Sequence, residues 1–284
     1  MPNLRDVKQR IRSVKNTEQM TKAMKLVSAS KLRKAQRAIQ TARPYAHKMR
    51  DVMNHLVARC HKDLHPLLDH REGNRVLLVV ITADRGLCGG FNSNIVKMAQ
   101  QLITENVDRD ISLFIAGKKG MDFFQNRPYR IEDKYLGWTK DFEYLKAVEI
   151  GEMLAQLFIE KKTDRIYLVY NEFKSIIQQE VIREQLLPIV PEEVGSDLTD
   201  YIFEPDEETI LADLLKRYMT TQIYRAFLES SASEHGARMT AMDAASRNAK
   251  EMIGELTLFY NRTRQAHITK ELIEIVNGAE ALKG

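Results

Sequence analysis

Hydrophobic residues at the start of the chain recur at alternating spacings of three and four, the pattern of a coiled-coil helix. From residue 3 to about 58 the repeating positions are Leu4, Val7, Ile11, Val14, Leu32, Ala35, Ile39, Ala42, Ala46, Met49, Met53 and Leu56. Between them Glu18, Thr21, Lys25 and Ser28 are polar, so Met20, Met24 and Val27 are expected to continue the seam one residue earlier. We also expect a kink or stop at Pro44, because proline costs a helix interior about 3 kcal/mol.

The end of the chain repeats this pattern after Pro205, with no further proline. Its seam positions are Leu211, Leu214, Tyr218, Leu228, Ala232, Met239, Met242, Ala249, Ile253, Leu256 and Tyr260, continued slightly out of phase by Ile268, Leu272, Ile275, Ala279 and Leu282. Small residues gather between Ala226 and Ala249, which lets a partner helix approach closely. At about 1.5 Å per residue each helix would be on the order of 80 Å long, so the two segments are predicted to pair as a rod.

The middle of the chain alternates between strand and helix patterns. Continuous aliphatic runs at 75–82, 111–116 and 165–170 are typical of strands buried on both faces, and 175–186 predicts a further strand. Residues 91–104, 121–125 and 141–160 predict helices between them. The predicted fold class is therefore α/β: a long antiparallel two-helix coiled coil of the terminal segments 1–58 and 207–284, with a central open, Rossmann-like α/β domain over 59–206.

Charge is distributed unevenly along the chain. The net charge is +4, but residues 1–50 hold fourteen Lys or Arg and two acidic residues, Asp6 and Glu18, so the other 234 residues sum to −8. A basic helix of this kind suits a nucleic-acid backbone, an anionic membrane surface or carboxylates on another protein. The alternative is a solvated helix face with no partner.

Cysteine usage and hydropathy favour a reducing compartment and no membrane span. Cys60 and Cys88 show neither metal-site spacing nor a disulfide framework, and both thiols are expected to be free. The first eleven residues are charged and lack the apolar core of a signal peptide, and no apolar run is long enough to cross a bilayer.

Few motifs suggest chemistry at a site. The glycine-rich stretch 86–93 follows a predicted strand and begins a predicted helix, the place where α/β proteins often bind phosphate. Neither this stretch nor 117–120 has the glycine spacing of a nucleotide-binding loop. The alternative for 86–93 is a tight turn that presents a surface loop. Cys88 lies at a helix N-terminus, where a thiolate is stabilised, with no histidine nearby in sequence. His61, His65 and His70 lack the intervals of a zinc site and fit a solvated loop better. We expect no catalytic, cofactor-binding or metal-binding residue.

Four stretches together resemble one known family. They are Ser13–Thr17 with Thr21–Arg33, Asp84–Asn94, Ser233–Ala245, and Arg264–Ala266 with Ile268–Val276. In this order, and over the whole chain, they resemble the gamma subunit of bacterial F-type ATP synthase. The chain lacks the inserted cysteine segment of the chloroplast form.

The resemblance implies a non-catalytic rotor. Its coiled coil would enter a hexamer of alpha and beta subunits, and its body would bind the epsilon subunit and the c-subunit ring at the cytoplasmic face of the cell membrane. The residues that it implies for contact with beta are Met24, Cys88, Arg238, Arg264, Gln265 and Thr269. Those that it implies for the side facing the c ring and epsilon are Arg43, Tyr45, Tyr201 and Glu204.

Two other functions fit parts of the sequence. A nucleic-acid-binding protein would use the basic helix on phosphates and lose affinity steeply as salt rises, but no groove-reading or aromatic motif accompanies the charge. An α/β enzyme with helical arms would turn over ATP without partner subunits, and we expect no such turnover.

Overall fold

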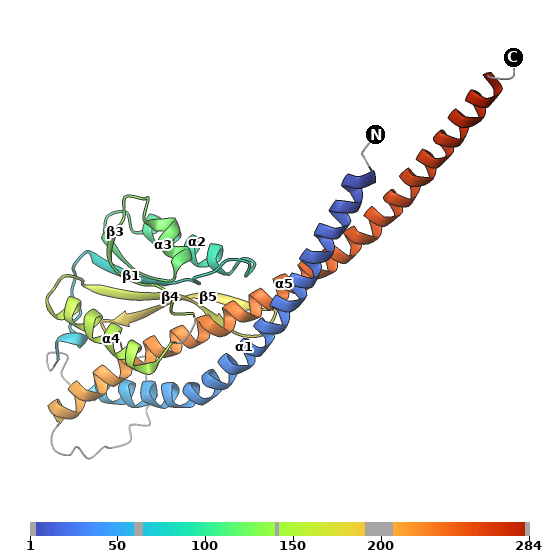
Figure 1. Ribbon diagram of the computed structural model, residues 1–284. Coiled ribbons are helices and arrows are strands. Elements are labelled where there is room, and N and C mark those ends of the chain that lie inside the picture. Colours follow the sequence, from blue (N-terminus) through green and yellow to red (C-terminus); the bar gives the residue numbers. More distant parts are fainter. Residues whose placement is uncertain (1–3, 60–64, 140–141, 191–206, 282–284) are drawn as a thin grey trace. The chain divides into compact units, whose positions relative to one another are not determined.

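The structure is a computed structural model that describes residues 4–59, 65–139, 142–190 and 207–281 (Figure 1). It confirms the predicted fold class: helices formed by the terminal segments and a central, mostly parallel sheet. The elements are α1 (Leu4–Arg59), η2 (Pro66–Leu68), β1 (Arg75–Ile81), α2 (Phe91–Glu105), β2 (Asp110–Ala116), α3 (Lys118–Phe124), β3 (Arg130–Tyr135), α4 (Tyr144–Ile159), β4 (Arg165–Phe173), β5 (Gln179–Leu187) and α5 (Glu207–Ala281).

The sheet has the strand order β3-β2-β1-β4-β5. β1 pairs in parallel with β2 and β4, β2 pairs in parallel with β3, and β5 alone is antiparallel, on β4. Because β1, β2 and β3 are parallel neighbours, the loops that follow them meet at the carboxyl edge of the sheet.

Both faces of the sheet are covered, which explains the continuous aliphatic runs in its central strands. On one face, alternate residues of β1 pack with α2 and α3 in a core that includes Ile95, Leu113 and Phe124. On the other face, α4, the later part of α1 and the earlier part of α5 form a larger core around Trp138 and Phe227.

The chain divides into two compact units. One comprises residues 28–238, with the sheet and the helix parts that cover it, and the other comprises residues 1–27 with 239–284. α1 ends at Arg59 and α5 begins at Glu207, and the two units divide within both of these long helices.

In the two-helix unit, α1 and α5 run antiparallel, since both described chain ends lie at the same end of the pair (Figure 1). Lys25 Nζ lies 2.5 Å from Asp243 Oδ1. Thr21 is 9% exposed, whereas Met20 and Val27 are 64% and 58% exposed. The predicted shift of the seam is therefore wrong for Met20 and Val27, whereas Met24 is half-buried, as Lys25 is. The original register continues through Thr21 and Lys25, because small or ion-paired polar side chains suit a close helix contact.

A kink or a stop was predicted at Pro44, and the stop is wrong, because α1 continues to Arg59 with Pro44 inside it. Figure 1 shows this part of α1 as curved. Ala46, Met49 and Met53 are all buried, so burial of the following turns offsets the missing amide hydrogen bond.

Strand β3 was not predicted from the sequence. Its residues read RIEDKY and none is fully buried, so it lacks an apolar alternation. Other boundaries differ by a few residues: α3 begins at Lys118 rather than 121, α4 at Tyr144 rather than 141, and β5 at Gln179 rather than 175.

Candidate functional site

The loop between β1 and α2, residues 84–90, is held by the carboxylate of Asp84. This group accepts hydrogen bonds from the backbone N–H groups of Lys118 (3.1 Å), Gly137 (2.8 Å) and Thr139 (3.2 Å), and from Thr139 Oγ1 (2.8 Å). Burial by itself would raise the pKa of Asp84, but these bonds outweigh it and lower the pKa. Asp84 therefore ties the segments that follow β1, β2 and β3 into one rigid edge.

Gly117 makes the close approach at this edge. Its φ of +92° is one that other residues rarely adopt, and a Cβ placed there would lie 2.0 Å from the carbonyl oxygen of Thr82. Thr82 Oγ1 in turn accepts a hydrogen bond from the backbone N–H of Gly120 at 2.8 Å. The stretch 117–120 thus serves strand-to-helix packing.

Arg238 holds the same loop from α5. Its Nη2 donates to the carbonyl oxygens of Arg85 (3.4 Å) and Gly86 (3.2 Å), and its Nη1 donates to Glu234 Oε1 at 2.6 Å. The Arg238 side chain is 10% exposed. The structure therefore brings Arg238 and the glycine loop together, with the guanidinium directed inward.

The tip of the loop presents Leu87 rather than Cys88. Leu87 is 64% exposed and has a φ of 61°, which is uncommon for a residue with a side chain and persists where neighbouring contacts fix it. Cys88 is 2% exposed, and Asn92 Nδ2 donates to its Sγ at 3.2 Å. Burial raises the pKa of the Cys88 thiol, which disfavours a nucleophilic thiolate. Sequence reasoning missed Leu87, and only its position beside the glycines could have pointed to it.

The end of α5 lies exposed over many turns. Since Lys25 pairs with Asp243, Leu4 lies opposite the region of residue 264, so α1 does not accompany α5 beyond it. Every residue from Arg264 to Ala279 is exposed, including Gln265 and Thr269. The predicted seam positions Ile268, Leu272 and Ile275 are 47%, 57% and 67% exposed.

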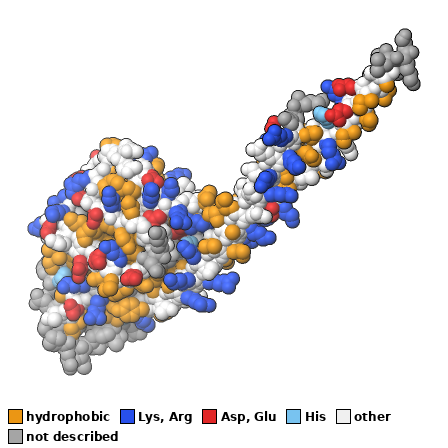
Figure 2. All heavy atoms as spheres, viewed as in Figure 1, with side chains coloured by type: hydrophobic (Ala, Val, Ile, Leu, Met, Phe, Trp, Pro, Cys, Tyr) orange, Lys and Arg blue, Asp and Glu red, His pale blue; other side chains and the backbone are white. Residues whose placement is uncertain are grey.

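The first turns of α1 are strongly basic. Arg5, Lys8, Arg12 and Lys15 border a shallow groove of about 730 Å³ on this helix. Figure 2 shows Lys and Arg side chains at several places along the two-helix unit, with hydrophobic side chains between them. An acidic surface would complement this face.

Comparisons with known proteins match this chain over its whole length. The family model described as ATP synthase matches residues 3–282. The ATP synthase gamma chain of Chlorobaculum parvum is 47% identical over 292 residues, and that of Anaeromyxobacter sp. strain K is 49% identical over 290 residues; both alignments cover 100% of each chain. The chain belongs to the gamma-subunit family of F-type ATP synthases.

Solved structures share the fold of this chain. A chain of the Tetrahymena thermophila mitochondrial ATP synthase central stalk and c-ring structure has a TM-score of 0.63 and 28% identity, over 80% of this chain and 99% of that one. A chain of the Euglena gracilis mitochondrial ATP synthase in rotational state 3 shares the fold, with a TM-score of 0.73 and 21% identity, over 98% and 94% of the two chains.

The remaining residues expected from the gamma-subunit resemblance have varied environments. Met24 is half-buried, and Tyr45 is 52% exposed. The Arg43 guanidinium makes hydrogen bonds within the chain. Its Nε and Nη2 donate to the Glu229 carboxylate at 2.8 and 2.9 Å, and its Nη2 donates to the Phe173 carbonyl at 3.0 Å. Tyr201 and Glu204 lie outside the described residues.

Neither a cluster of metal-ligand side chains nor a membrane-spanning helix is found in the described part of this gamma-family chain. Its described His, Cys, Asp and Glu side chains form no group of three or more that could hold a metal ion. His65 Nδ1 accepts a hydrogen bond from Leu67 N, and His61 and Cys60 lie outside the described residues. Within the described ranges, no helix combines the length and apolar character that a bilayer crossing requires.

Proposed function

We propose that this chain is the central-stalk rotor of an F-type ATP synthase, which couples rotation of the membrane c ring to conformational change in the catalytic beta subunits. The observation that carries the proposal is the end-to-end match to proteins named ATP synthase gamma chain. The chain itself performs no catalysis, and its work is mechanical.

The coupling between rotation and nucleotide affinity follows from the asymmetry of the α1–α5 helix pair. α1 and α5 present different side chains around the helix pair, basic on α1 and apolar on the end of α5. Three beta subunits around one such pair meet three different faces, and each face favours a different conformation. Rotation then exchanges nucleotide affinities among the three sites, which is a coupling free energy between rotor angle and binding.

Contacts with beta would use the two-helix unit and the loop. Arg264 and Gln265, with Thr269 one turn later, would meet a loop of beta, because they are exposed on α5 beyond α1. The basic face that includes Lys22 beside Met24 would pass acidic segments of beta, where complementary charge would keep the two surfaces aligned without a deep apolar contact that would stall rotation. From the body, Leu87 would make the contact expected of its buried neighbour Cys88.

Contacts with the c ring and epsilon would use a part of the body other than the loop at 84–90. Tyr45 is the exposed candidate there, and Tyr201 and Glu204 remain candidates from the resemblance. Arg43 would act indirectly, by fixing α1 against Glu229. The chain would be peripheral to the cytoplasmic face of the cell membrane, attached through these subunits.

Assembly with alpha and beta subunits tests the proposal. We expect a complex with one copy of this chain for three alpha and three beta subunits in native mass spectrometry, and ATP hydrolysis only in the presence of alpha and beta. Duplex DNA added at physiological salt tests the alternative that the chain is a nucleic-acid-binding protein. Failure to form the complex, or ATP turnover by the purified chain alone, would contradict the proposal.

A further inference from the structure

The hairpin between β4 and β5 presents an isoleucine to solvent. Its tip comprises residues 174–178, and Ile177 is 85% exposed. Tight turns are usually built from Gly, Pro, Asn, Asp or Ser, so an exposed β-branched apolar residue is unusual at this place. Burial of such a side chain by another protein would be favourable.

Hydrogen bonds within the hairpin fix its tip. The backbone N–H of Ser175 donates to the Gln178 carbonyl at 3.0 Å, and the Gln178 N–H donates to Ser175 Oγ at 3.0 Å. Gln179 Nε2 donates to the carbonyl oxygens of Ser175 (3.3 Å) and Ile176 (2.8 Å). The backbone that carries Ile177 is therefore ordered before any partner binds, which lowers the entropy cost of a contact.

The charged side chains of the hairpin pair with one another. Lys174 Nζ lies 2.6 Å from Glu172 Oε2 and 3.9 Å from Glu180 Oε2. These charges lie at the base of the tip, and the residue that the tip presents is apolar. A contact made there would depend on burial of Ile177 rather than on charge.

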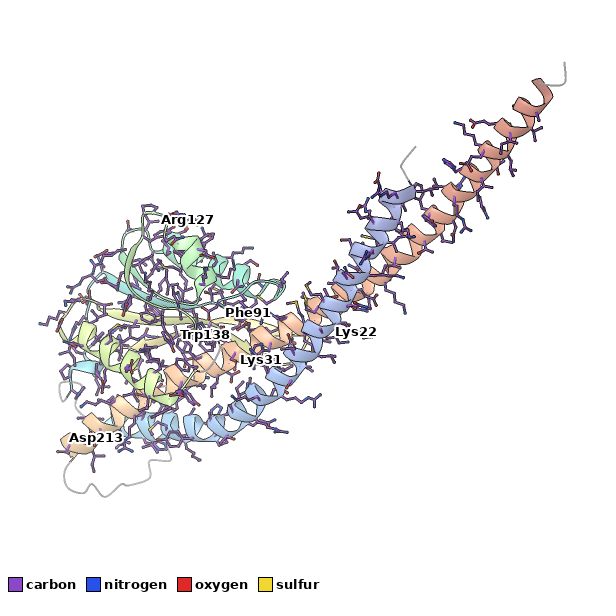
Figure 3. All side chains as sticks on the ribbon, viewed as in Figure 1. Lys22, Lys31, Phe91, Arg127, Trp138 and Asp213 are labelled. Carbon is purple, nitrogen blue, oxygen red and sulfur yellow. The ribbon has the colours of Figure 1, made fainter. Side chains whose placement is uncertain are left out.

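The hairpin and the loop 84–90 lie at the same edge of the sheet. β1 and β4 are parallel neighbours, so the segments that follow them both emerge at the carboxyl edge. Asn171 of β4 donates from Nδ2 to the carbonyl oxygen of Phe91, which begins α2 directly after the loop and is labelled in Figure 3. Leu87 and Ile177 are therefore the exposed apolar tips of two connected segments.

Helix α5 contacts both segments within one turn. A Cβ placed on Gly236 would lie 3.4 Å from Phe173 Cε2 and 3.5 Å from the carbonyl oxygen of Ile176, so the α5 backbone lies close to the hairpin. Two residues later, Arg238 donates to the loop carbonyls. Arg238 is also the last residue of the compact unit 28–238. Both tips are thus fixed to α5 where the chain passes from the body to the two-helix unit.

We propose that Ile177 is a second apolar contact of the body with the beta subunits, beside the contact at Leu87. This inference rests on the proposed function, in which a hexamer encloses the two-helix unit. Body segments fixed to α5 at the boundary with that unit would be among the first that the hexamer meets. Because Ile177 is apolar and its turn is ordered, the matching surface of beta would be an apolar depression rather than an acidic segment.

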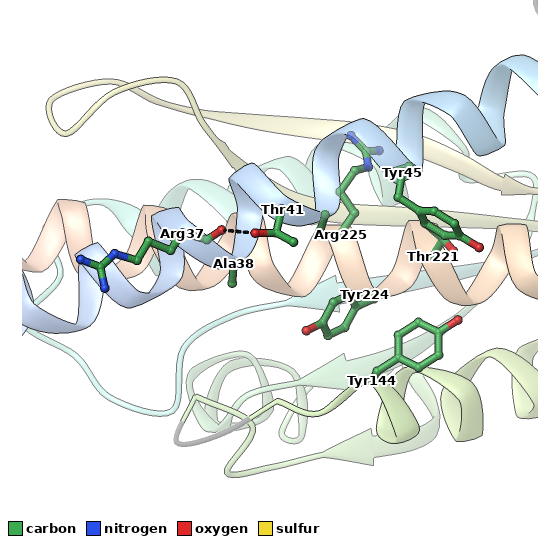
Figure 4. Close-up of a pocket in the computed structure, with 10 residues that line it drawn as sticks. Arg37, Ala38, Thr41, Tyr45, Tyr144, Thr221, Tyr224 and Arg225 are labelled. Carbon is green, nitrogen blue, oxygen red and sulfur yellow. Dashed lines mark hydrogen bonds between the residues drawn. The ribbon is translucent and has the colours of Figure 1, made fainter.

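Other exposed apolar residues of the body belong to a different surface. Tyr45 and Tyr144 line a cavity of about 490 Å³ with Tyr224 of α5 (Figure 4). Tyr224 lies more than three turns before Gly236 on α5, about 18 Å along the helix axis. The cavity is therefore separate from the hairpin tip.

Photo-crosslinking identifies the partner of the tip. p-Benzoylphenylalanine replaces Ile177, Leu87 or Val107, and each chain is assembled with alpha, beta and epsilon subunits. Val107 is the matched control, because it is 77% exposed but precedes β2, at the amino edge of the sheet. On irradiation we expect a product with beta from positions 177 and 87, and none with beta from position 107.

The rate of dissociation measures the strength of the contact. Ile177→Asp places a charge in an apolar contact, so we expect a fluorescently labelled chain to leave the assembled complex about tenfold faster. Val107→Asp introduces the same charge at the control position and should dissociate at the wild-type rate. Both residues are exposed, so both variants should keep the fold, which circular dichroism checks.

The inference is overturned if position 177 gives no crosslinked product, if its products contain alpha or epsilon but not beta, or if Ile177→Asp dissociates at the wild-type rate. A product with beta from position 87 and none from position 177 would overturn this inference alone. A wild-type chain that forms no complex would overturn the proposed function as well.

Discussion

Three adjacent buried residues of α5, Glu234, His235 and Arg238, illustrate how polar groups are accommodated in this fold. Arg238 is satisfied by Glu234 and by two loop carbonyls. Glu234 keeps one oxygen without a partner in the described structure, and burial raises its pKa. His235 avoids the cost of a buried charge by remaining neutral.

The low pKa of His235 makes stability depend on pH. In the unfolded chain a histidine has a pKa near 6.5, so below that pH the unfolded state takes up a proton first, and the folded state loses stability until about pH 4. At pH 5 this cost is about 2 kcal/mol. We expect His235→Gln to remove it, so that the variant gains about 2 kcal/mol relative to the wild type between pH 7 and pH 5 in urea denaturation.

The matched control is His267→Gln, because the side chain of His267 is 59% exposed. This variant should follow the pH dependence of the wild type. Equal pH dependence in His235→Gln and the wild type would show that the imidazole is not kept neutral by the fold.

Single residues were the hardest feature to predict from the sequence. Thr21 and Ser28 looked like interruptions of an apolar seam, yet Ser28 is 3% exposed, because a close helix contact favours small side chains over large apolar ones. Cys88 attracted attention as a reactive residue type, whereas the exposed residue of the loop is Leu87. Neither outcome follows from residue type alone, since both depend on which way the backbone turns.

At the scale of elements, α1 is tied to the body by buried ion pairs. The Glu229 side chain is 1% exposed and accepts from Arg43 and from the Phe173 backbone N–H. Glu184 of β5 accepts from Arg50 Nη2 (3.0 Å), Arg225 Nη2 (2.6 Å) and Tyr170 Oη (2.7 Å). These bonds connect α1, α5 and the β4–β5 pair on both sides of Pro44.

Removing Arg43 should therefore destabilise the fold. Arg43→Met leaves the buried Glu229 carboxylate with only a backbone donor. We expect the free energy of unfolding, measured by chemical denaturation, to fall by about 2–3 kcal/mol. This loss is small for a buried ion pair because Arg43 is partly exposed. Lys48→Met, on the same helix with an 84% exposed side chain, should change stability by less than about 0.5 kcal/mol. An Arg43→Met variant as stable as the wild type would mean that the hydrogen bond from the Phe173 backbone N–H is enough to stabilise the Glu229 carboxylate.

Elements with a strong periodicity were predicted well, and those with a weak one were not. The long helices and the aliphatic strands β1, β2 and β4 followed from their spacing. β3 was missed because an edge strand of charged residues carries no apolar alternation, and its position depends on pairing with β2. The continuation of α1 past Pro44 depends on tertiary packing, which cannot be predicted from the local sequence.

At the scale of the whole molecule, the gamma-subunit resemblance predicts where α5 acts on its partners. Arg264→Ala together with Gln265→Ala removes two exposed polar groups, so the isolated chain should keep its fold. In the assembled complex we expect ATPase turnover coupled to rotation to fall on the order of five- to tenfold, as for truncation of a central contact.

The control for this double variant is Lys97→Ala together with Gln101→Ala, an exposed pair on α2. It removes the same kinds of groups from the body and should leave turnover unchanged. Unaltered ATPase in the complex that carries the Arg264 and Gln265 changes would count against their role in torque transfer.

The unaccompanied end of α5 has a consequence for biogenesis. A lone helix of this length is marginal in water, and its aliphatic side chains stabilise it only once another surface covers them. It should therefore gain its full order only when a partner surface covers it, and a protease should cleave this stretch faster in unassembled copies than in copies already incorporated.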